Sequence, residues 1–393
     1  MKRIFKSQTI AAGLAIFSMF FGAGNVVFPL QIGRLAGDKN IFAIIGLLVT
    51  AVGVPFLGLF ATILFNGDYK KFFYRIGKIP GLFAMLSCMA LIGPFAALPR
   101  CISLSYSTLK IFMPGTSLFV FSLIACIVLF ALAVRKSRIV DILGKVLSPV
   151  LLISLAIIII KGFISSPAAP ALGASSVGLL KKGFVEGYNT MDMLATFFFS
   201  GVVISSLMVG HQRVGQNKSV DGVPSKKLIA TVVKAGILGV SLLGIVCVGF
   251  SYVASFFANE LIGIPSDSLI SAISIKVLGP YGGVIANVSV ALACLTTAIT
   301  LAIVFAEFIQ SELFGNYVKY PFVLLVTLVI AFAVSNLGFS GIMAMIKPVL
   351  AIWYPGLLVL SVVNILYKLI KFKPVKIPVF ATVAIAIIGH LIK

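Results

Sequence analysis

Apolar runs of about 20 residues, the length of a membrane-spanning helix, recur along the whole chain and limit it to few folds. The mean hydropathy of +1.18 and the 10% share of charged residues lie far from the balance of a soluble domain. Runs such as LLISLAIIII (151–160) do not alternate as barrel strands would. The sequence therefore predicts an all-α integral membrane protein with a single transporter-sized membrane domain over residues 1–393.

The net charge of +21 is divided into short basic clusters between the apolar runs. Most lysines and arginines lie on alternate loops, beginning with Lys2, Arg3 and Lys6. Because loops rich in Lys and Arg stay on the cytoplasmic side, we expect a cytoplasmic amino terminus. No element carries a continuous basic stripe, so the lipid membrane, and not nucleic acid, is the expected partner.

Charged residues and Pro/Gly punctuation divide the chain into predicted membrane helices. There are about eleven of them, at 8–30, 41–65, 80–110, 117–134, 146–164, 188–210, 228–257, 281–311, 320–337, 341–367 and 376–392. The polar segment 165–187 is predicted to be a loop that connects two halves. These halves are 1–164 and 188–367, and 376–392 is an additional helix.

Each predicted half begins with a helix that contains small residues in mid-span. In the first half these lie in FFGAGN (20–25), and in the second half they are Ser200 and Gly201 in FFFSG (197–201). Paired interruptions at corresponding positions are typical of inverted-repeat transporters, whose substrate site lies at the interruptions. Glycines in membrane helices also let neighbouring helices pack closely, and either pair taken alone fits packing better than a substrate site. The occurrence of both pairs at corresponding positions makes the two interpretations equally good.

The sequence lacks the signatures of enzymes and ATP-driven pumps. It contains neither GxxxxGK[ST] nor HExxH, and no nucleophile, base and acid converge in any predicted span. We therefore expect neither an enzyme nor a bound cofactor. The carboxylates avoid the span centres, and the two nearest to interiors, Asp192 and Glu307, are expected at the membrane interface.

A sodium ion can find oxygen ligands without these carboxylates. An interrupted helix leaves backbone carbonyls free, and residues 18–25 supply them. Thr296, Thr297 and Thr300 in the eighth predicted span add hydroxyl oxygens. A threonine hydroxyl in a helix commonly donates back to a carbonyl of its own helix, and this structural alternative stays open.

The same interruptions can bind a zwitterion. The amino-terminal ends of half-helices direct free N–H groups and partial positive charge toward a carboxylate. The interruptions are flanked by apolar side chains that favour an aliphatic ligand or serve in packing: Phe20, Phe21, Phe198, Phe199 and Val202. Arg100 and Lys347 also lie within predicted spans. Each either reaches the interface with its charged end or takes the place of a cation inside the bundle.

Five motifs together closely resemble the branched-chain amino acid carrier family, BrnQ. They are FFGAGNVVFP (20–29), GPFAALPR (93–100), GYNTMD (187–192), CLTTA (294–298) and VSNLGFSG (334–341). The resemblance implies sodium-coupled uptake of leucine, isoleucine and valine across a bacterial inner membrane. It also implies a LeuT-type fold with two inverted repeats of five helices and breaks in the first and sixth helices.

Carried over by position, the resemblance implies a substrate site at the two breaks. Its residues are Gly22, Ala23, Gly24, Asn25, Phe198, Phe199, Ser200 and Gly201. It implies sodium bound by Asn25 beside the substrate and, at a second site, by Ser18, Phe21, Thr296 and Thr297. The chain departs from the family pattern at Ser107, where an acid is common, at Lys347, where an apolar residue is expected, and in stopping before a twelfth span.

Two other functions fit the residues. A proton-coupled carrier of another small amino acid or of a nucleobase would use the same scaffold, and transport without sodium would distinguish it. A channel or receptor would use the interruptions to line a pore or to sense a ligand without moving it. The order of preference among leucine, isoleucine and valine does not follow from the sequence.

Overall fold

The computed structural model describes residues 2–134, 152–213 and 226–392, and its elements there are helices. The first half contains α1 (Lys2–Phe20), α2 (Ala23–Ala36), α3 (Asn40–Leu48), a π-helical turn (Val49–Gly53), α4 (Val54–Ile63), α5 (Tyr69–Phe73), α6 (Lys78–Ile92), α7 (Ala97–Leu109), α8 (Leu118–Ala133) and the apolar helix Leu152–Ile164. The second half contains α10 (Ser176–Asn189), α11 (Asp192–Arg213), α12 (Lys226–Phe256), α13 (Leu269–Glu312), α14 (Tyr320–Ser335), α15 (Gly338–Ile370) and α16 (Lys376–Leu391). The expectation of an all-helical protein is confirmed.

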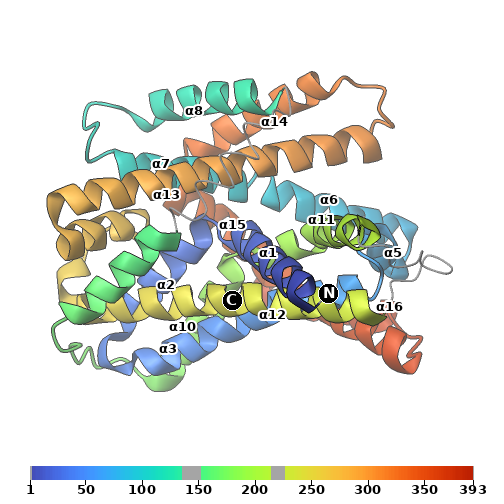
Figure 1. Cartoon of the computed structure of the whole chain (residues 1–393), viewed down its shortest axis with the longest axis horizontal. Coiled ribbons are helices and arrows are strands. Elements are labelled where there is room, and N and C mark those ends of the chain that lie inside the picture. Colours follow the sequence, from blue (N-terminus) through green and yellow to red (C-terminus); the bar gives the residue numbers. More distant parts are fainter. Residues whose placement is uncertain (1, 135–151, 214–225, 393) are drawn as a thin grey trace.

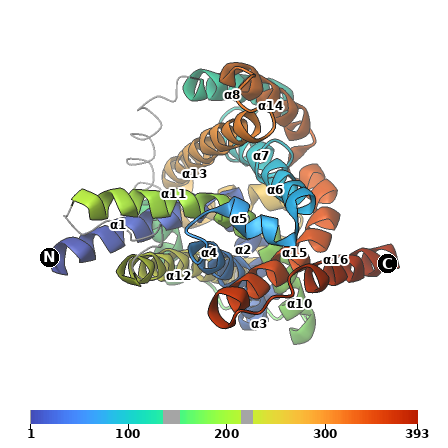
Figure 2. The same cartoon turned by 90° about the vertical axis from the view of Figure 1, so that its right-hand side faces the viewer.

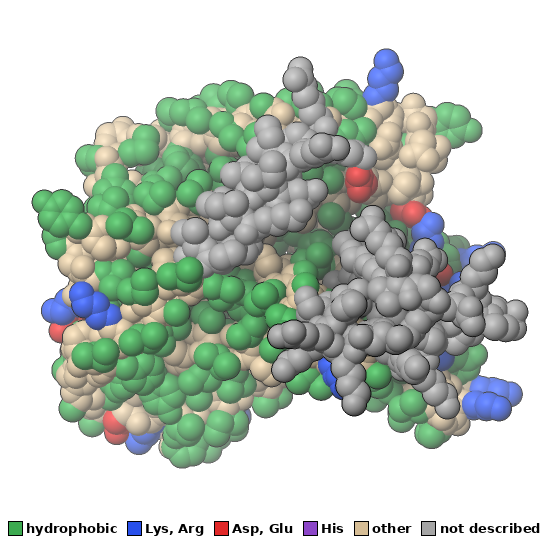
Figure 3. Space-filling view, viewed as in Figure 1, with side chains coloured by type: hydrophobic (Ala, Val, Ile, Leu, Met, Phe, Trp, Pro, Cys, Tyr) green, Lys and Arg blue, Asp and Glu red, His purple; other side chains and the backbone are tan. Residues whose placement is uncertain are grey.

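The outer surface has the character of a membrane protein. Five helical segments of the described chain are long and apolar enough to cross a bilayer: Ala23–Ile63, Lys78–Leu109, Ala230–Phe256, Ser266–Glu312 and Gly338–Ile370. Large apolar side chains such as Ile127 and Ile285 lie 61% and 66% exposed on the outside of the bundle. Charged side chains gather toward the two ends of the molecule, with a largely hydrophobic band between them (Figure 3). Lipid would cover that band.

The helix α2 packs against α10 and α12. The helices α8 and α14 pack together at one edge, above α7 and α13 (Figure 1). The helix α1 lies against both α11 and α12, and α16 packs on α15 and projects from the opposite side of the bundle (Figure 2). Most residues of α2 are buried, whereas α1 and α10 each keep an exposed face, on which Ile10 and Val177 are 45% and 63% exposed.

The first helix is broken where the glycine-rich motif predicted it. The helix α1 ends at Phe20, and α2 begins at Ala23. Gly22 is extended, with φ −127° and ψ −173°, and its carbonyl accepts the Asn25 N–H at 3.1 Å. This part of the prediction is confirmed.

The predicted break at Ser200 and Gly201 is wrong, because α11 continues through both residues. The Ser200 hydroxyl donates to the Phe197 carbonyl within the helix at 3.1 Å. A Cβ on Gly201 would lie 3.0 Å from the Gly67 carbonyl oxygen, so this glycine allows close packing against the segment after α4. The packing interpretation therefore holds for this pair.

The second break lies ten residues earlier, between α10 and α11, at Thr190 and Met191. The helix α10 begins at Ser176, inside the segment predicted to be a connecting loop. It is held by close contact with α3: a Cβ on Gly183 would lie only 2.0 Å from the Ala43 carbonyl oxygen. Small residues allow such backbone approach between membrane helices. The broken helix of the second half is thus α10 followed by α11.

Both halves also contain an interruption in their third helix. Residues 93–96 separate α6 from α7, and α13 is kinked at Gly279, where φ is +75° before Pro280. The proline in each region, Pro94 or Pro280, cannot donate a helical hydrogen bond. The order of broken, continuous and interrupted helices is therefore repeated in the two halves.

Candidate functional site

The two helix breaks contact each other at the centre of the molecule. A Cβ on Gly24 would lie 3.0 Å from Thr190 Cα and 3.2 Å from the Thr190 carbonyl oxygen. No side chain larger than hydrogen fits between these backbones without displacing one of them. The start of α2 and the end of α10 therefore form one site, although they are far apart in sequence.

A hydrogen-bonded pair crosses the same point. Asn25, on α2, donates from Nδ2 to the Phe20 carbonyl at 2.7 Å and to Asp192 Oδ1 at 3.0 Å. Asn25 is fully buried, and Asp192, the first residue of α11, is 4% exposed. The expectation that Asp192 lies at the interface is wrong. Its acid group belongs to the central site.

The second break has a strained backbone. Met191 has φ +65°, a left-handed conformation that non-glycine residues rarely adopt, and its side chain is buried. Such conformations persist where the surrounding structure enforces them, and they are common at functional sites. Here the enforcing contacts come from Gly24 on one side and Arg100 on another.

Arg100 holds the carboxyl end of α10. It is 2% exposed, and its Nη1 donates to the Asn189 carbonyl at 2.7 Å while Nη2 donates to the Thr190 carbonyl at 3.4 Å. The last carbonyls of a helix lack partners in the helix and carry partial negative charge. Two interpretations were open for Arg100. The structure supports the one in which its charged group takes the place of a cation inside the bundle.

Lys347 takes the other interpretation and reaches the surface. Its side chain is 43% exposed, and Nζ lies 3.6 Å from Glu186 Oε1. Glu186, through Oε2, accepts a hydrogen bond from Asn189 Nδ2 at 2.7 Å. A polar chain thus leads from the surface to the end of α10.

Thr297 lies beside the first break, as predicted, but Thr296 does not line the same space. A small pocket of about 10 Å³ is lined by Phe21, Gly22, Val26, Val290, Ala293, Cys294 and Thr297. Thr296 and Thr297 both donate to the Ala293 carbonyl, at 2.9 and 3.0 Å. The structural alternative is therefore realised for both hydroxyls. Each hydroxyl oxygen still keeps acceptor capacity, which a cation could use.

The predicted substrate residues on α11 lie away from the breaks. The Phe198 ring centroid is 5.2 Å from that of Tyr69 and 5.9 Å from that of Phe308. About eight residues, roughly 12 Å along the helix, separate Phe198 from Thr190. The structure therefore brings Gly22, Ala23, Gly24 and Asn25 together with the second break, but not Phe198, Phe199, Ser200 or Gly201. A role of those four in substrate binding stays a prediction.

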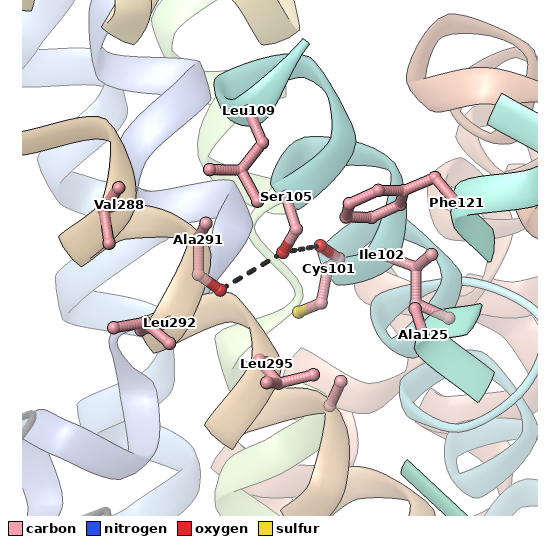
Figure 4. Close-up of a pocket in the computed structure, with 11 residues that line it drawn as sticks. Cys101, Ile102, Ser105, Leu109, Phe121, Ala125, Val288, Ala291, Leu292 and Leu295 are labelled. Atoms are coloured by element: carbon pink, nitrogen blue, oxygen red, sulfur yellow. Dashed lines mark hydrogen bonds between the residues drawn. The ribbon is translucent and has the colours of Figure 1, made fainter. Parts of the chain in front are cut away.

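A larger pocket of about 120 Å³ lies between α7, α8 and α13 (Figure 4). Its walls are mainly aliphatic, with Leu109, Leu292 and Leu295 among them. The Ser105 hydroxyl lies on its wall, within hydrogen-bond distance of the carbonyl oxygens of Cys101 and Ala291, at 2.9 and 3.2 Å, and donates its one proton to either of them (Figure 4). Charged groups of a ligand would find no charged side chain on this wall, so the space suits an apolar group.

The arrangement of these helices defines a structural class, the helical membrane fold of LeuT type. The chain superposes on an inward-facing conformation of Mhp1 with a TM-score of 0.62 and 14% identity, covering 93% of this chain and 77% of that chain. It also superposes on a closed conformation of Mhp1, described as a nucleobase-cation-symport-1 family transporter with bromovinylhydantoin bound, with a TM-score of 0.57 and 15% identity. That match covers 97% of this chain and 91% of the other. At such identities the likeness concerns the fold alone.

The family follows from the sequence comparisons. The chain belongs to the branched-chain amino acid transport protein family, whose model matches residues 5–393. It is 32% identical over 371 residues to the branched-chain amino acid permease BrnQ of Corynebacterium glutamicum, covering 93% of this chain and 82% of that one. It is 31% identical over 384 residues to BrnQ and 30% identical over 374 residues to BraB, two permeases of Bacillus subtilis. These matches cover 95% and 93% of this chain, and 84% and 81% of the relatives. The predicted resemblance is confirmed.

Proposed function

We propose that this protein is a sodium symporter that imports leucine, isoleucine and valine across the bacterial inner membrane by alternating access. The observation that carries the proposal is the contact between the two helix breaks, at Gly24 and Thr190. In a transporter with inverted repeats, substrate and coupling ions bind near the bilayer midplane where discontinuous helices meet. The basic loops on one side support a cytoplasmic amino terminus.

The breaks offer complementary groups for an amino acid. The amino-terminal end of α2, at Ala23 and Gly24, begins after a residue that has no side chain to cap its N–H groups. Such an end attracts the substrate carboxylate. The carboxyl end of α1 offers carbonyl oxygens as acceptors to the ammonium group. The buried Phe20 and Phe21 supply apolar contacts for an aliphatic side chain.

The coupling ion has candidate ligands around the first break. Thr297 and Phe21 line one small cavity, and Ser18 lies one helical turn before Phe21 on the same helix. We propose that the Thr297 hydroxyl oxygen and carbonyl oxygens near Ser18 and Phe21 bind one sodium ion. Asn25 is the proposed ligand of a second ion beside the substrate. Thr296 remains a candidate only if α13 turns relative to its position here.

Transport then follows from movement of the breaks. Sodium entering from outside fills the sites between α1, α2 and α13, the amino acid binds beside it, and the central helices rock within the surrounding bundle. The strained backbone at Met191 marks a point where such a motion can change the angle between α10 and α11. Downhill sodium entry drives the uphill movement of the amino acid.

The test is uptake of labelled leucine into proteoliposomes that contain the purified protein. Inward sodium, inward proton and no gradient are compared, with unlabelled isoleucine, valine and alanine as competitors. Accumulation driven by sodium and competed by isoleucine and valine, but not by alanine, is the expected result. Accumulation driven by protons alone would overturn the sodium assignment, and single-channel currents without accumulation would overturn the carrier mechanism.

A further inference from the structure

The pair formed by Asn25 and Asp192 leaves two buried oxygen atoms without a partner. The orientation of the Asn25 amide is fixed, because its Nδ2 donates to two acceptors, the Phe20 carbonyl and Asp192 Oδ1. Asn25 Oδ1 and Asp192 Oδ2 are then both buried and accept no hydrogen bond. Buried polar atoms are normally satisfied, so each exception requires an explanation.

The neighbouring donors do not satisfy Asp192 Oδ2. The Thr190 hydroxyl lies close to Asp192, but it has one proton and donates it to the Gly187 carbonyl at 2.8 Å. Arg100 directs its terminal N–H groups to the carbonyls at the end of α10. None of the ion pairs formed among the described residues includes Asp192. Asp192 Oδ2 therefore accepts no hydrogen bond from these neighbours.

We propose that Asn25 Oδ1 and Asp192 Oδ2 are ligands of a sodium ion that connects the two helix breaks. This inference rests on the proposed sodium coupling and adds Asp192 as the residue that supplies the charge of the site. Both atoms are hard oxygen ligands, and carbonyls freed by the breaks can complete the coordination of sodium. The described residues contain no cluster of three or more metal-binding acids, cysteines or histidines. One carboxylate matches a monovalent ion.

The burial of the two oxygens favours a small ion over the amino acid itself. Asn25 and Asp192 line neither the pocket beside Thr297 nor the pocket between α7, α8 and α13. The two oxygens also need a group that brings positive charge without taking much volume. The charge on Arg100 is offset by the carbonyl end of α10, so it leaves the Asp192 charge available for the ion.

The site predicts an order of binding. If the carboxylate of the amino acid completed the sodium site, sodium and the amino acid would have to bind together. Because Asp192 provides the negative charge from the protein, sodium binds to the empty transporter and does so first. Asn25 belongs to α2 and Asp192 to α11, so the ion fixes the relative position of the helices that follow the two breaks. Sodium thereby prepares the site for the amino acid.

The experiment measures binding of sodium-22 to the purified full-length protein by scintillation proximity, without any amino acid. A Thr297→Ala background disables the other proposed sodium site, so the remaining binding reports this one. Asp192→Asn keeps the shape of the side chain and removes its charge, and we expect the apparent sodium affinity to fall at least tenfold. Asp38→Asn, an exposed acid at the end of α2, is the matched control and leaves the affinity unchanged.

A second variant protects the test against misfolding. Asn25→Ala removes Oδ1 and leaves the carboxylate, and it should also weaken sodium binding, while Asp192→Glu should retain part of it. Unchanged sodium affinity in monodisperse Asp192→Asn would overturn the inference. So would a variant that loses leucine binding but keeps sodium binding, since Asp192 would then bind the ammonium group. Sodium-independent uptake by the wild type is a separate result, measured in proteoliposomes, and it would overturn the proposed function.

Discussion

The two helix breaks reach the same place in the fold by different means. The first break consists of small residues around Gly22, whose extended backbone needs no support from elsewhere. The second break contains Thr190 and Met191, and Met191 adopts a left-handed conformation that its own side chain disfavours. Contacts from other helices, mainly Arg100 of α7 and Gly24 of α2, hold this second break.

This difference separates local from tertiary control of backbone shape. The first break should tolerate changes in its neighbours, because its extended backbone is a conformation that any residue can adopt. The second break should collapse or shift when its distant contacts are removed. The predictions below test this contrast, from the largest expected effect to the smallest.

Gly24→Val should abolish leucine uptake. Its Cβ would lie 3.0 Å from Thr190 Cα, so the backbones at the two breaks must separate. Gly22→Ala is the matched control in the same motif, since a Cβ there would meet only a Thr297 methyl group, at 4.0 Å. We expect Gly22→Ala to retain uptake within about threefold, a small effect for a substitution that meets open space.

Uptake by both variants is measured in proteoliposomes after their amounts have been matched by immunoblotting. Equal loss in the two variants would show that the contact between the breaks is not the critical feature. Full activity of Gly24→Val would contradict the close approach of α2 to Thr190.

Arg100→Met should reduce uptake about a hundredfold and lower the thermal stability. The substitution removes hydrogen bonds from a charged donor to two buried carbonyls, each worth about 1.5–3 kcal/mol. Arg100→Lys keeps the charge but lacks the planar fork, so it should restore part of the stability and less of the transport. Melting temperatures in detergent and uptake are measured together. A stable Arg100→Met protein with normal uptake would remove Arg100 from the support of the second break.

Thr297→Ala should raise the sodium concentration required for half-maximal uptake about tenfold, which corresponds to about 1.4 kcal/mol of lost ion binding. The order of competition among isoleucine, valine and leucine should stay the same, because the hydroxyl faces the proposed ion and not the aliphatic side chain. Thr296→Ala, one position away and outside the cavity beside the break, serves as the control. A larger effect at Thr296 would place the sodium site on the other face of α13.

The helical class, the membrane spans and the first break followed from the sequence because each depends on local properties. Long apolar runs must form helices in a bilayer, where backbone groups cannot bond to water. Gly22 marks a break because glycine is a poor helix former. The location of the first break was therefore predictable from local properties, whereas the proximity of Thr297 to it was implied only by the family resemblance.

The second break could not be found by the same reasoning. A search for glycine selected Ser200 and Gly201, whose small size serves packing against Gly67 instead. The actual break lies within GYNTMD (187–192), a polar interval before an apolar helix. Its signal was the Asn-Thr and Asp pattern, since such residues commonly occur at helix ends. The burial of Asp192 and the partners of Arg100 depend on tertiary contacts, which no local pattern specifies.

Lys347→Ala should have the smallest effect, with uptake within about twofold of the wild type and a stability change below about 1 kcal/mol. The ammonium group is largely solvated and lies 3.6 Å from Glu186, so it contributes little to a pair that water and ions screen. Glu186 keeps its hydrogen bond from Asn189 after the substitution. Glu186→Gln preserves an acceptor for Asn189, so we expect it to change uptake and stability as little as Lys347→Ala does. Lys347→Ala could instead lose as much uptake as we expect for Arg100→Met. In that case the support of the second break would extend from α7 to the surface of α15. The contrast between the two breaks would then be greater than the buried contacts indicate.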